Sequence, residues 1–359
     1  MGLKMNTKLK NNKPDFDIAA RRMEAYWQGE MLDRPIIMAS TSKKNYDFVK
    51  YSTYHDRAVS GDLEQILKNM LHNARGINYL GEMMPSAWMS FGTHEISSFF
   101  GSKIIWTDGS GDTTWTNPIV LDWDEFLPLH FPEGNSYWQR MLKFYEKSAE
   151  IFDGEVLPIS IDFHSNMDLL LSLRGDEQLS YDVYDCPEKI DAAMEGAKLT
   201  FKHIWEAVEK AAKMKEYGYW YEGYSEKRTC VLACDYICMI SPEMLRRWFI
   251  PTFEYEASLI DNVVFHWDGP GALRHFNDIM AIDKIHTIAY VPNPYEKHKD
   301  YMELYKKVQE NGKAVLYHGS IDEIKSVFYE LNPAKTLYKL TSATEKEFYD
   351  FEKWVKNNV

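Results

Sequence analysis

A histidine and an aspartate two residues apart follow a short apolar run in the C-terminal half of the chain. Residues 263–265 (Val-Val-Phe) have the character of a buried strand, and His266 and Asp268 end it just before a Gly-Pro-Gly turn at 269–271. Alternate side chains of a strand point to the same side, so these two should point the same way. Polar groups at such a place are costly to bury unless paired. The pattern predicts two ligands of one metal ion, or an acid/base pair.

Other predicted strands also end in polar side chains. Asp162 and His164 follow one strand, and Glu222 and Asp235 follow two others. In parallel α/β folds the strand ends gather on the face where ligands bind, so we expect these side chains to lie close together. Two alternatives stay open: Asp162 as a turn or helix-cap residue, and His266 as a core histidine bonded to backbone.

Two further features have more than one interpretation. Residues 101–118 are rich in Gly, Ser, Thr and Asp and contain Trp115, which suits either a lid or a plain surface loop. Cys230, Cys234 and Cys238 form C-x3-C-x3-C, but cluster ligands should converge from a flexible loop, and the first two lie in an apolar strand. We predict small buried hydrophobes, with Cys234 as a minor candidate for a soft metal ligand.

The elements that must position these residues alternate along the whole chain. Strands are predicted at 35–39, 86–91, 155–162, 217–221, 229–235, 263–265, 287–291, 314–318 and 336–340. Helices are predicted at 17–28, 137–152, 187–214, 242–260, 299–310, from 321, and up to about 357. This rhythm, without a Gly-rich dinucleotide motif, predicts an α/β fold of the (β/α)₈ TIM-barrel type. We expect a single domain over 1–359, with an N-terminal helical extension over 1–30.

Composition excludes several classes of partner. Lys and Arg total 41 against 54 Asp and Glu, a net charge of −13. Nucleic acids and anionic membranes require a basic surface, so neither is expected as a partner. No apolar stretch approaches the length of a membrane span, and the N-terminus lacks the apolar core of a secretory signal. We expect a cytoplasmic protein.

Four segments resemble the uroporphyrinogen decarboxylase superfamily: 23–35 (MEAYWQGEMLDRP), 162–187, 234–251 (CDYICMISPEMLRRWFIP) and 266–275 (HWDGPGALRH). The resemblance implies a (β/α)₈ barrel and either a decarboxylase or a corrinoid-dependent methyltransferase. Decarboxylases of this superfamily hold their tetrapyrrole with arginines after the first strand. Residues 39–44 here (ASTSKK) contain none. Without that cation clamp, decarboxylation of uroporphyrinogen is not expected.

The methyltransferase branch binds zinc through His-x-Cys, and Asp268 stands here in place of that cysteine. The resemblance therefore implies zinc in a harder, oxygen-containing site, held by His266, Asp268 and Glu222, with Asp235 as the alternative third ligand. It implies the demethylase component of a corrinoid-dependent system. This enzyme would move a methyl group from a small ether, alcohol or amine to a corrinoid protein that carries the cobalamin.

The remaining site residues are assigned on this basis. Catalytic roles are expected for Asp162, Glu222 and Asp235. Substrate binding is expected for His164, Trp115, Tyr221 and Trp267. The alternatives are a lyase of the same barrel acting on another carboxylate, and a non-catalytic barrel that binds a small molecule. Whether the chain forms a homodimer is left open.

Overall fold

The computed structural model describes residues 7–106 and 114–359 and shows a mixed α/β fold around a largely parallel sheet. Within these residues seven strands form the main sheet, in the order β2-β1-β13-β12-β11-β10-β9. Adjacent strands are parallel except β1 and β2, which are antiparallel. The strands are β1 (Ile36–Ser42), β2 (Ile77–Gly81), β9 (Thr229–Ala233), β10 (Asn262–Asp268), β11 (Ile285–Val291), β12 (Ala314–Gly319) and β13 (Thr336–Leu340).

The predicted closed barrel is not found in the described part of the chain. The segments 86–91 and 155–162, expected as full strands, supply only β3 (Ser86–Ala87) and β6 (Leu157–Pro158), which pair with each other. Pro158 has no backbone N–H and cannot donate to a neighbouring strand. This pair forms a sheet of its own, and the seven-stranded sheet stays open at β2 and β9. The α/β class and the parallel sheet are confirmed, and the closure of eight strands is not.

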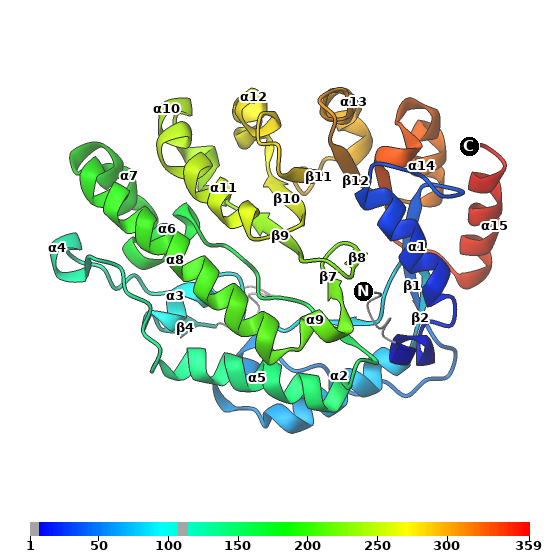
Figure 1. Cartoon of the computed structure of the whole chain (residues 1–359), viewed down its shortest axis with the longest axis horizontal. Coiled ribbons are helices and arrows are strands. Elements are labelled where there is room, and N and C mark those ends of the chain that lie inside the picture. Colours follow the sequence, from blue (N-terminus) through cyan, green and yellow to red (C-terminus); the bar gives the residue numbers. More distant parts are fainter. Residues whose placement is uncertain (1–6, 107–113) are drawn as a thin grey trace.

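Helices connect the strands and form the outer layers. They are α1 (Phe16–Trp27), α2 (Leu63–Arg75), α3 (Glu95–Phe99), α4 (Trp123–Phe126), α5 (Ser136–Phe152), α6 (Met167–Arg174), α7 (Asp176–Asp185), α8 (Pro187–Ala211), α9 (Met214–Tyr217), α10 (Pro242–Met244), α11 (Ile250–Ser258), α12 (Phe276–Met280), α13 (Met302–Glu310), α14 (Ile321–Val327) and α15 (Glu345–Lys356). Figure 1 shows α11, α12, α13 and α14 in a row beyond strands β9 to β12, with α2 and α5 at the opposite side of the molecule.

Local sequence signals explain where several elements begin. Ser320 and Glu323 form a capping box at the start of α14, and Thr344 and Glu347 form another at the start of α15. Each box satisfies backbone N–H groups that a helix start leaves without partners. These helices lie where the sequence predicts them, as do β13 and α5. Strand β2 and helix α2 are additions that the sequence analysis did not predict.

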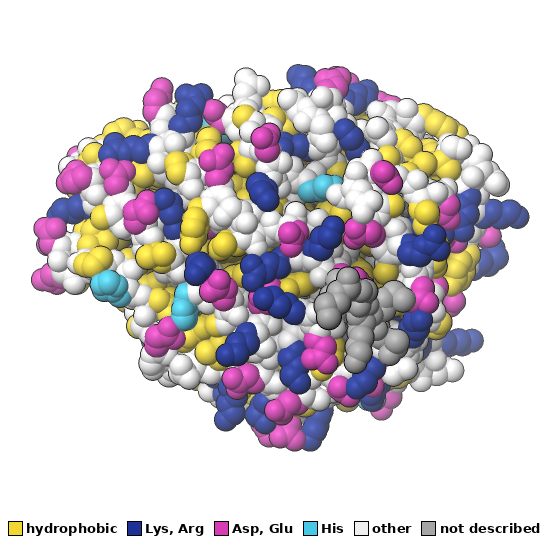
Figure 2. Space-filling view, in the orientation of Figure 1, with side chains coloured by type: hydrophobic (Ala, Val, Ile, Leu, Met, Phe, Trp, Pro, Cys, Tyr) yellow, Lys and Arg dark blue, Asp and Glu magenta, His cyan; other side chains and the backbone are white. Residues whose placement is uncertain are grey.

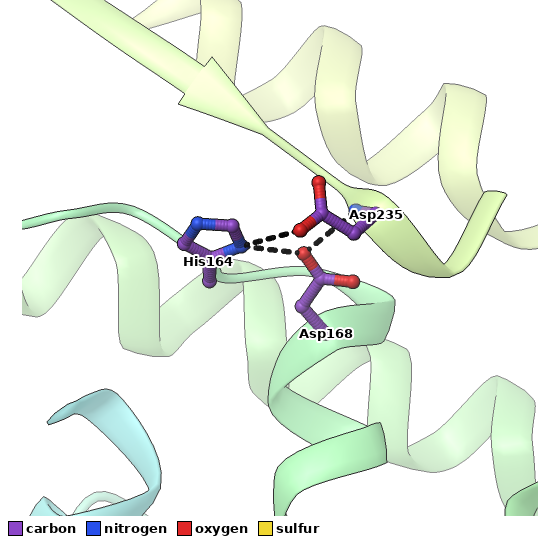
Figure 3. Close-up of side chains that lie close together, drawn as sticks. All are labelled: His164, Asp168 and Asp235. Atoms are coloured by element: carbon purple, nitrogen blue, oxygen red, sulfur yellow. Dashed lines mark hydrogen bonds and ion pairs between the residues drawn. The ribbon is translucent and has the colours of Figure 1, made fainter. Parts of the chain in front are cut away.

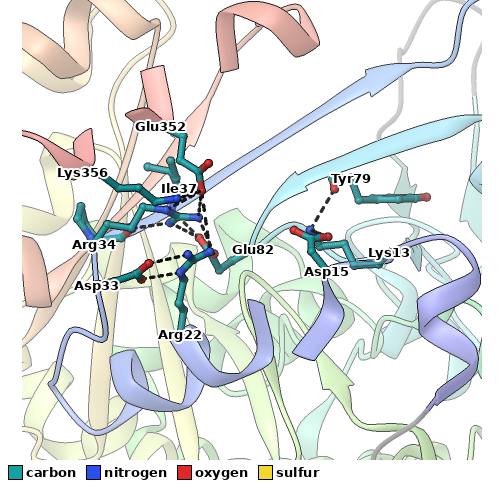
Figure 4. A network of polar contacts seen from close by, with 11 residues as sticks. Lys13, Asp15, Arg22, Asp33, Arg34, Ile37, Tyr79, Glu82, Glu352 and Lys356 are labelled. Atoms are coloured by element: carbon teal, nitrogen blue, oxygen red, sulfur yellow. Dashed lines mark hydrogen bonds and ion pairs between the residues drawn. The ribbon is translucent and has the colours of Figure 1, made fainter. Parts of the chain in front are cut away.

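The N-terminal helix is attached to the sheet through a buried network of charges (Figure 4). The guanidinium of Arg34 donates to Glu82 at 2.7 and 2.8 Å and to Glu352 at 3.0 Å. Arg22 of α1 donates to Asp33 at 2.7 Å and to Glu82 at 3.2 Å. Glu82 and Arg34 are almost fully buried. This network joins α1, β1, the end of β2 and α15, so the predicted N-terminal extension is an integral part of the fold.

Residues 107–113 of the predicted lid lie outside the described residues. The flanking segments form a small antiparallel pair, β4 (Ile104–Ile105) and β5 (Trp115–Thr116).

Among the helices that the structure describes, none combines the length and the apolar character needed to cross a membrane. Acidic and basic side chains are interspersed over the face shown in Figure 2.

Candidate functional site

Three potential metal ligands meet where β9 and β10 end. Strand β10 places His266 and Asp268 on one side, with Trp267 on the other. The parallel register pairs His266 with Ala233 of β9, so Asp235, two residues beyond Ala233, comes beside Asp268. One ligand atom from each of Asp235, His266 and Asp268 lies within 4.8 Å of the others. His266 and Asp268 thus lie together as the sequence predicts, and the third potential ligand beside them is Asp235.

A second group of three overlaps the first through Asp235 (Figure 3). His164 Nδ1 lies 2.9 Å from Asp168 Oδ2 and 3.9 Å from Asp235 Oδ2. On the other side of the ring, His164 Nε2 lies 3.6 Å from Asp162 Oδ2. Asp168, at the start of α6, also accepts the backbone N–H groups of Asp235 and Tyr236, each at 2.9 Å. Asp168 therefore joins the ring of His164 to the chain segment that carries Asp235.

The pKa values of the histidines in the two groups shift in opposite directions. Burial lowers the pKa of His164, but the hydrogen bond to Asp168 and the charges of Asp162, Asp168 and Asp235 outweigh it and raise that pKa to about 10. Burial, followed by the charge of Asp168, raises the pKa of Asp235 to about 7. Burial, then the charge of His164, lowers the pKa of His266. At neutral pH His164 is an imidazolium and His266 a neutral imidazole, the form that binds metals.

The donor set of Asp235, His266 and Asp268 suits a divalent cation. Asp235 Oδ1 is buried and has no hydrogen-bond partner among the residues that the structure describes. A buried carboxylate oxygen without a partner is costly, and a bound cation would satisfy it. Two carboxylates and one imidazole match the mixed oxygen and nitrogen ligands of zinc sites that keep an open position.

A cavity of about 430 Å³ lies beside this cluster. Its lining combines carboxylates, histidines, aromatic rings and small apolar side chains: Trp88, Asp162, His164, Tyr221, Glu222, Val231, Ala233, His266, Ala289, Tyr290, Val291, His298, Leu316 and His318. The Tyr221 hydroxyl donates to Asp162 Oδ1 at 3.4 Å. Asp162, His164, Tyr221, Glu222 and His266, all proposed from the sequence, thus share one cavity, and Asp235 and Asp268 adjoin it through His266.

Glu222 is paired with a lysine and is not in the group of Asp235, His266 and Asp268. It lies in the turn between β7 (Tyr219–Trp220) and β8 (Tyr224–Ser225), in left-handed backbone conformation with φ +57°. Both of its carboxylate oxygens accept from Lys339 Nζ at 2.7 Å. Glu222 is therefore not among the three potential ligands that lie together, whereas Asp235, the alternative third ligand, is. In the structure Glu222 forms an ion pair with Lys339 of β13 instead.

Two aromatic residues assigned to substrate binding lie elsewhere. Trp267 is fully buried and packs against Phe276 and Tyr290, because the alternation that directs His266 into the cavity directs Trp267 away from it. Trp115 is 45% exposed on β5 and does not line the cavity. Tyr221 and His164 do line it.

The sequence analysis missed several contributors. Asp168 carries a usable signal, because it is an acid that follows His164 by only four residues in the sequence. No pattern in the sequence points to Trp88 or Lys339. Glu95, fully buried on α3, accepts the backbone N–H of Asp162 at 2.9 Å and so positions that strand end. Burial raises the pKa of Glu95 to about 8.

The cysteines take no part in the cluster. All four are free; Cys230 and Cys234 are buried, and Cys186 and Cys238 are half-buried. Burial, then the charge of Asp168, raises the pKa of Cys234 well above its usual range, so it stays a thiol. Cys230 and Cys234 are thus buried as predicted, whereas Cys238 is only half-buried.

Comparison with solved structures shows the same fold in a methyltransferase from Methanosarcina mazei. The TM-score is 0.61 at 12% sequence identity, over 95% of this chain and 98% of the other. The likeness therefore extends along the whole chain, and at this identity it establishes a shared fold. The sequence matches no protein-family model and no curated protein.

Proposed function

We propose that this chain is a methyltransferase that moves a methyl group from a small ether, alcohol or amine to a corrinoid protein. The observation that carries the proposal is the cluster of Asp235, His266 and Asp268 beside a 430 Å³ cavity. A methyltransferase shares the fold over nearly the full length. The sequence motifs that resemble the uroporphyrinogen decarboxylase superfamily include His266 and Asp268 themselves.

The three ligands would hold zinc, which supplies Lewis acidity to a heteroatom that loses its methyl group. The chain's own residues then have separate roles. The aromatic and apolar walls position the donor and exclude water. Asp162 and Tyr221 bind polar parts of the donor at one side of the cavity. On this proposal the cobalamin belongs to the partner protein, and this chain supplies the donor site.

The cavity lining also disfavours decarboxylation of a multiply anionic substrate. None of the described residues that line it is Lys or Arg, and the nearby Lys339 is already paired with Glu222. A polycarboxylate would meet Asp162 and Glu222 without a cation clamp. We therefore expect no turnover of uroporphyrinogen, which a direct assay with that substrate would check.

The metal site is tested with a matched pair of histidine variants. His266→Ala removes a ligand, whereas His318→Ala removes a cavity histidine outside the three-ligand cluster. Loss of one ligand from so small a set should remove most of the bound metal. Metal content is measured in wild type and both variants, purified identically, with circular dichroism to check folding. Equal metal in folded wild type and His266→Ala would refute the metal role.

The reaction is tested by supplying methylated compounds together with cobalt(I) cobalamin. Formation of methylcobalamin, followed by its absorption spectrum, should require wild-type protein and one class of donor. The His266→Ala variant should lower the rate strongly and His318→Ala should lower it less. If a broad panel of ethers, alcohols and amines gives no methylcobalamin, the methyltransferase proposal fails.

A further inference from the structure

The charges around the cavity do not balance. Four carboxylates surround the ring of His164 or belong to the cluster that adjoins it: Asp162, Asp168, Asp235 and Asp268. The ring of His164 can supply at most one positive charge to them, and Glu222 is paired with Lys339. Asp162 lines the cavity itself and contacts no Lys or Arg among the described residues. A carboxylate without such a partner, in a site partly shielded from water, attracts a cation.

The walls of the cavity suit a cation that carries no hydrogen-bond donors. Trp88 and Tyr221 meet edge to face, with ring centroids 5.4 Å apart and planes at 74°. Two aromatic rings at such an angle form a corner, which is the arrangement that attracts quaternary ammonium groups through their ring faces. The lining also includes apolar aliphatic side chains: Val231, Ala233, Ala289, Val291 and Leu316.

We infer that the cavity binds a methylated ammonium cation, so that the methyl donor is a quaternary amine. This inference rests on the proposed function, which makes the cavity the binding site of the methyl donor. It selects the amine from the three donor classes that the proposal leaves open. A quaternary ammonium group presents only methyl and methylene surface, which the apolar side chains accept without unsatisfied polar groups. Its charge is met by Asp162 and by the excess of carboxylates.

An ether or an alcohol matches these features less well. A neutral donor leaves the excess negative charge unmet and gains nothing electrostatic from the corner of Trp88 and Tyr221. A carboxylate or phosphate donor would be repelled, because no Lys or Arg is among the described lining residues. A quaternary amine also departs as a neutral tertiary amine and needs no proton. Its nitrogen has no lone pair for a metal to polarise, so on this inference a metal at the cluster would bind a polar group elsewhere in the donor.

Binding of two nearly isosteric probes tests the inference directly. The cationic probe is choline, and the neutral one replaces its trimethylammonium group with a tert-butyl group. Both are titrated calorimetrically into the protein as purified. We expect choline to bind at least about tenfold more tightly, the size of one cation–π contact with partial desolvation. Equal affinities, or no detectable binding of choline and tetramethylammonium, would overturn the inference.

A pair of tryptophan variants locates the binding. Trp88→Leu removes one wall of the aromatic corner, whereas Trp115→Leu makes the same change at an exposed tryptophan outside the cavity lining. Choline affinity should fall about tenfold in the first variant and stay unchanged in the second. Tyr221→Phe keeps the ring and should retain most of the affinity. Equal choline affinity in folded Trp88→Leu and wild type would place the cation elsewhere and contradict the inference.

The inference and the proposed function fail in different ways. If methyl ethers give methylcobalamin but choline does not bind, the donor class is wrong and the methyltransferase proposal stands. If choline binds through Trp88 but no donor of any class gives methylcobalamin, the cation site stands and the methyltransferase proposal fails.

Discussion

Two clusters of buried charges in this molecule differ in whether their charges are matched. In the network of Figure 4, three cations (Arg22, Arg34 and Lys356) face three acids (Asp33, Glu82 and Glu352), and each guanidinium contacts at least two carboxylates. In the site of Figure 3, His164 is the one cation drawn, and it faces Asp168 and Asp235 with Asp162 on its other side. The first cluster is complete in itself, and the second lacks positive charge.

One acid from each cluster, Glu352 and Asp235, shows the contrast. Burial raises the pKa of Glu352, but the charges of Arg34 and Lys356 outweigh it and the net shift is downward. Burial and the charge of Asp168 raise the pKa of Asp235 to about 7. A shift of the second kind costs folding free energy, and such shifts are common at functional sites. The comparison therefore separates acids that are paired within the fold from an acid that is not.

The largest expected loss of unfolding free energy comes from removing the shared acid of the network in Figure 4. Glu82→Ala leaves Arg34 and Arg22 buried without their shared acid, which should cost about 3–5 kcal/mol of unfolding free energy. Urea unfolding monitored by circular dichroism measures this loss. Asp33→Ala, a change at a half-exposed partner of Arg22, should cost much less. Similar losses for the two variants would show that burial of an acid in this network does not determine how much it contributes to the unfolding free energy.

A smaller loss of unfolding free energy is expected when Asp168, which contacts His164, is changed. Asp168→Asn keeps the shape but removes acceptor capacity from His164 and from the backbone N–H groups of Asp235 and Tyr236. The cost should be about 1–3 kcal/mol. The pKa of His164, followed by NMR, should fall from about 10 toward its ordinary value. An unchanged His164 titration would mean that Asp168 does not hold its proton in place.

An acid without a cationic partner should make stability depend on pH. Burial raises the pKa of Glu256 to about 8, against an ordinary value near 4.5, although Ser165 and Asn166 donate to it. Its contribution to stability is complete below pH 4.5 and is lost as the pH rises toward 8, because the unfolded chain ionises first. Glu256→Gln should flatten that decline in urea unfolding at several pH values. An equally steep decline in the variant would exclude Glu256 as its source.

The smallest effect on stability is expected at the proposed metal ligand Asp268. This side chain is exposed, so Asp268→Asn should change the unfolding free energy by less than about 0.5 kcal/mol. Metal content should nevertheless fall sharply. Asp283→Asn, at an exposed acid outside the cluster, serves as the control and should change neither quantity. A folded Asp268→Asn protein with full metal content would remove Asp268 from the ligand set.

The sequence by itself determined the features that depend on local periodicity. Strand β13 and helix α5 lie at the predicted residues, since their apolar spacing and end signals are local. The shared direction of His266 and Asp268 follows from the two-residue period of a strand. The same period also places Trp267 in the core, a consequence that the assignment of this residue to substrate binding overlooked.

Tertiary structure decided which of the polar strand ends meet, because that depends on strand register and on which charges find partners. The register of β9 against β10 brings Asp235 beside Asp268, and Glu222 pairs with Lys339 of β13 instead of joining that group. The open sheet has a similar cause: the segments that would close it pair for only two residues each. Contacts between residues far apart in the chain leave no periodic signal in the sequence, so only the folded structure could assign them.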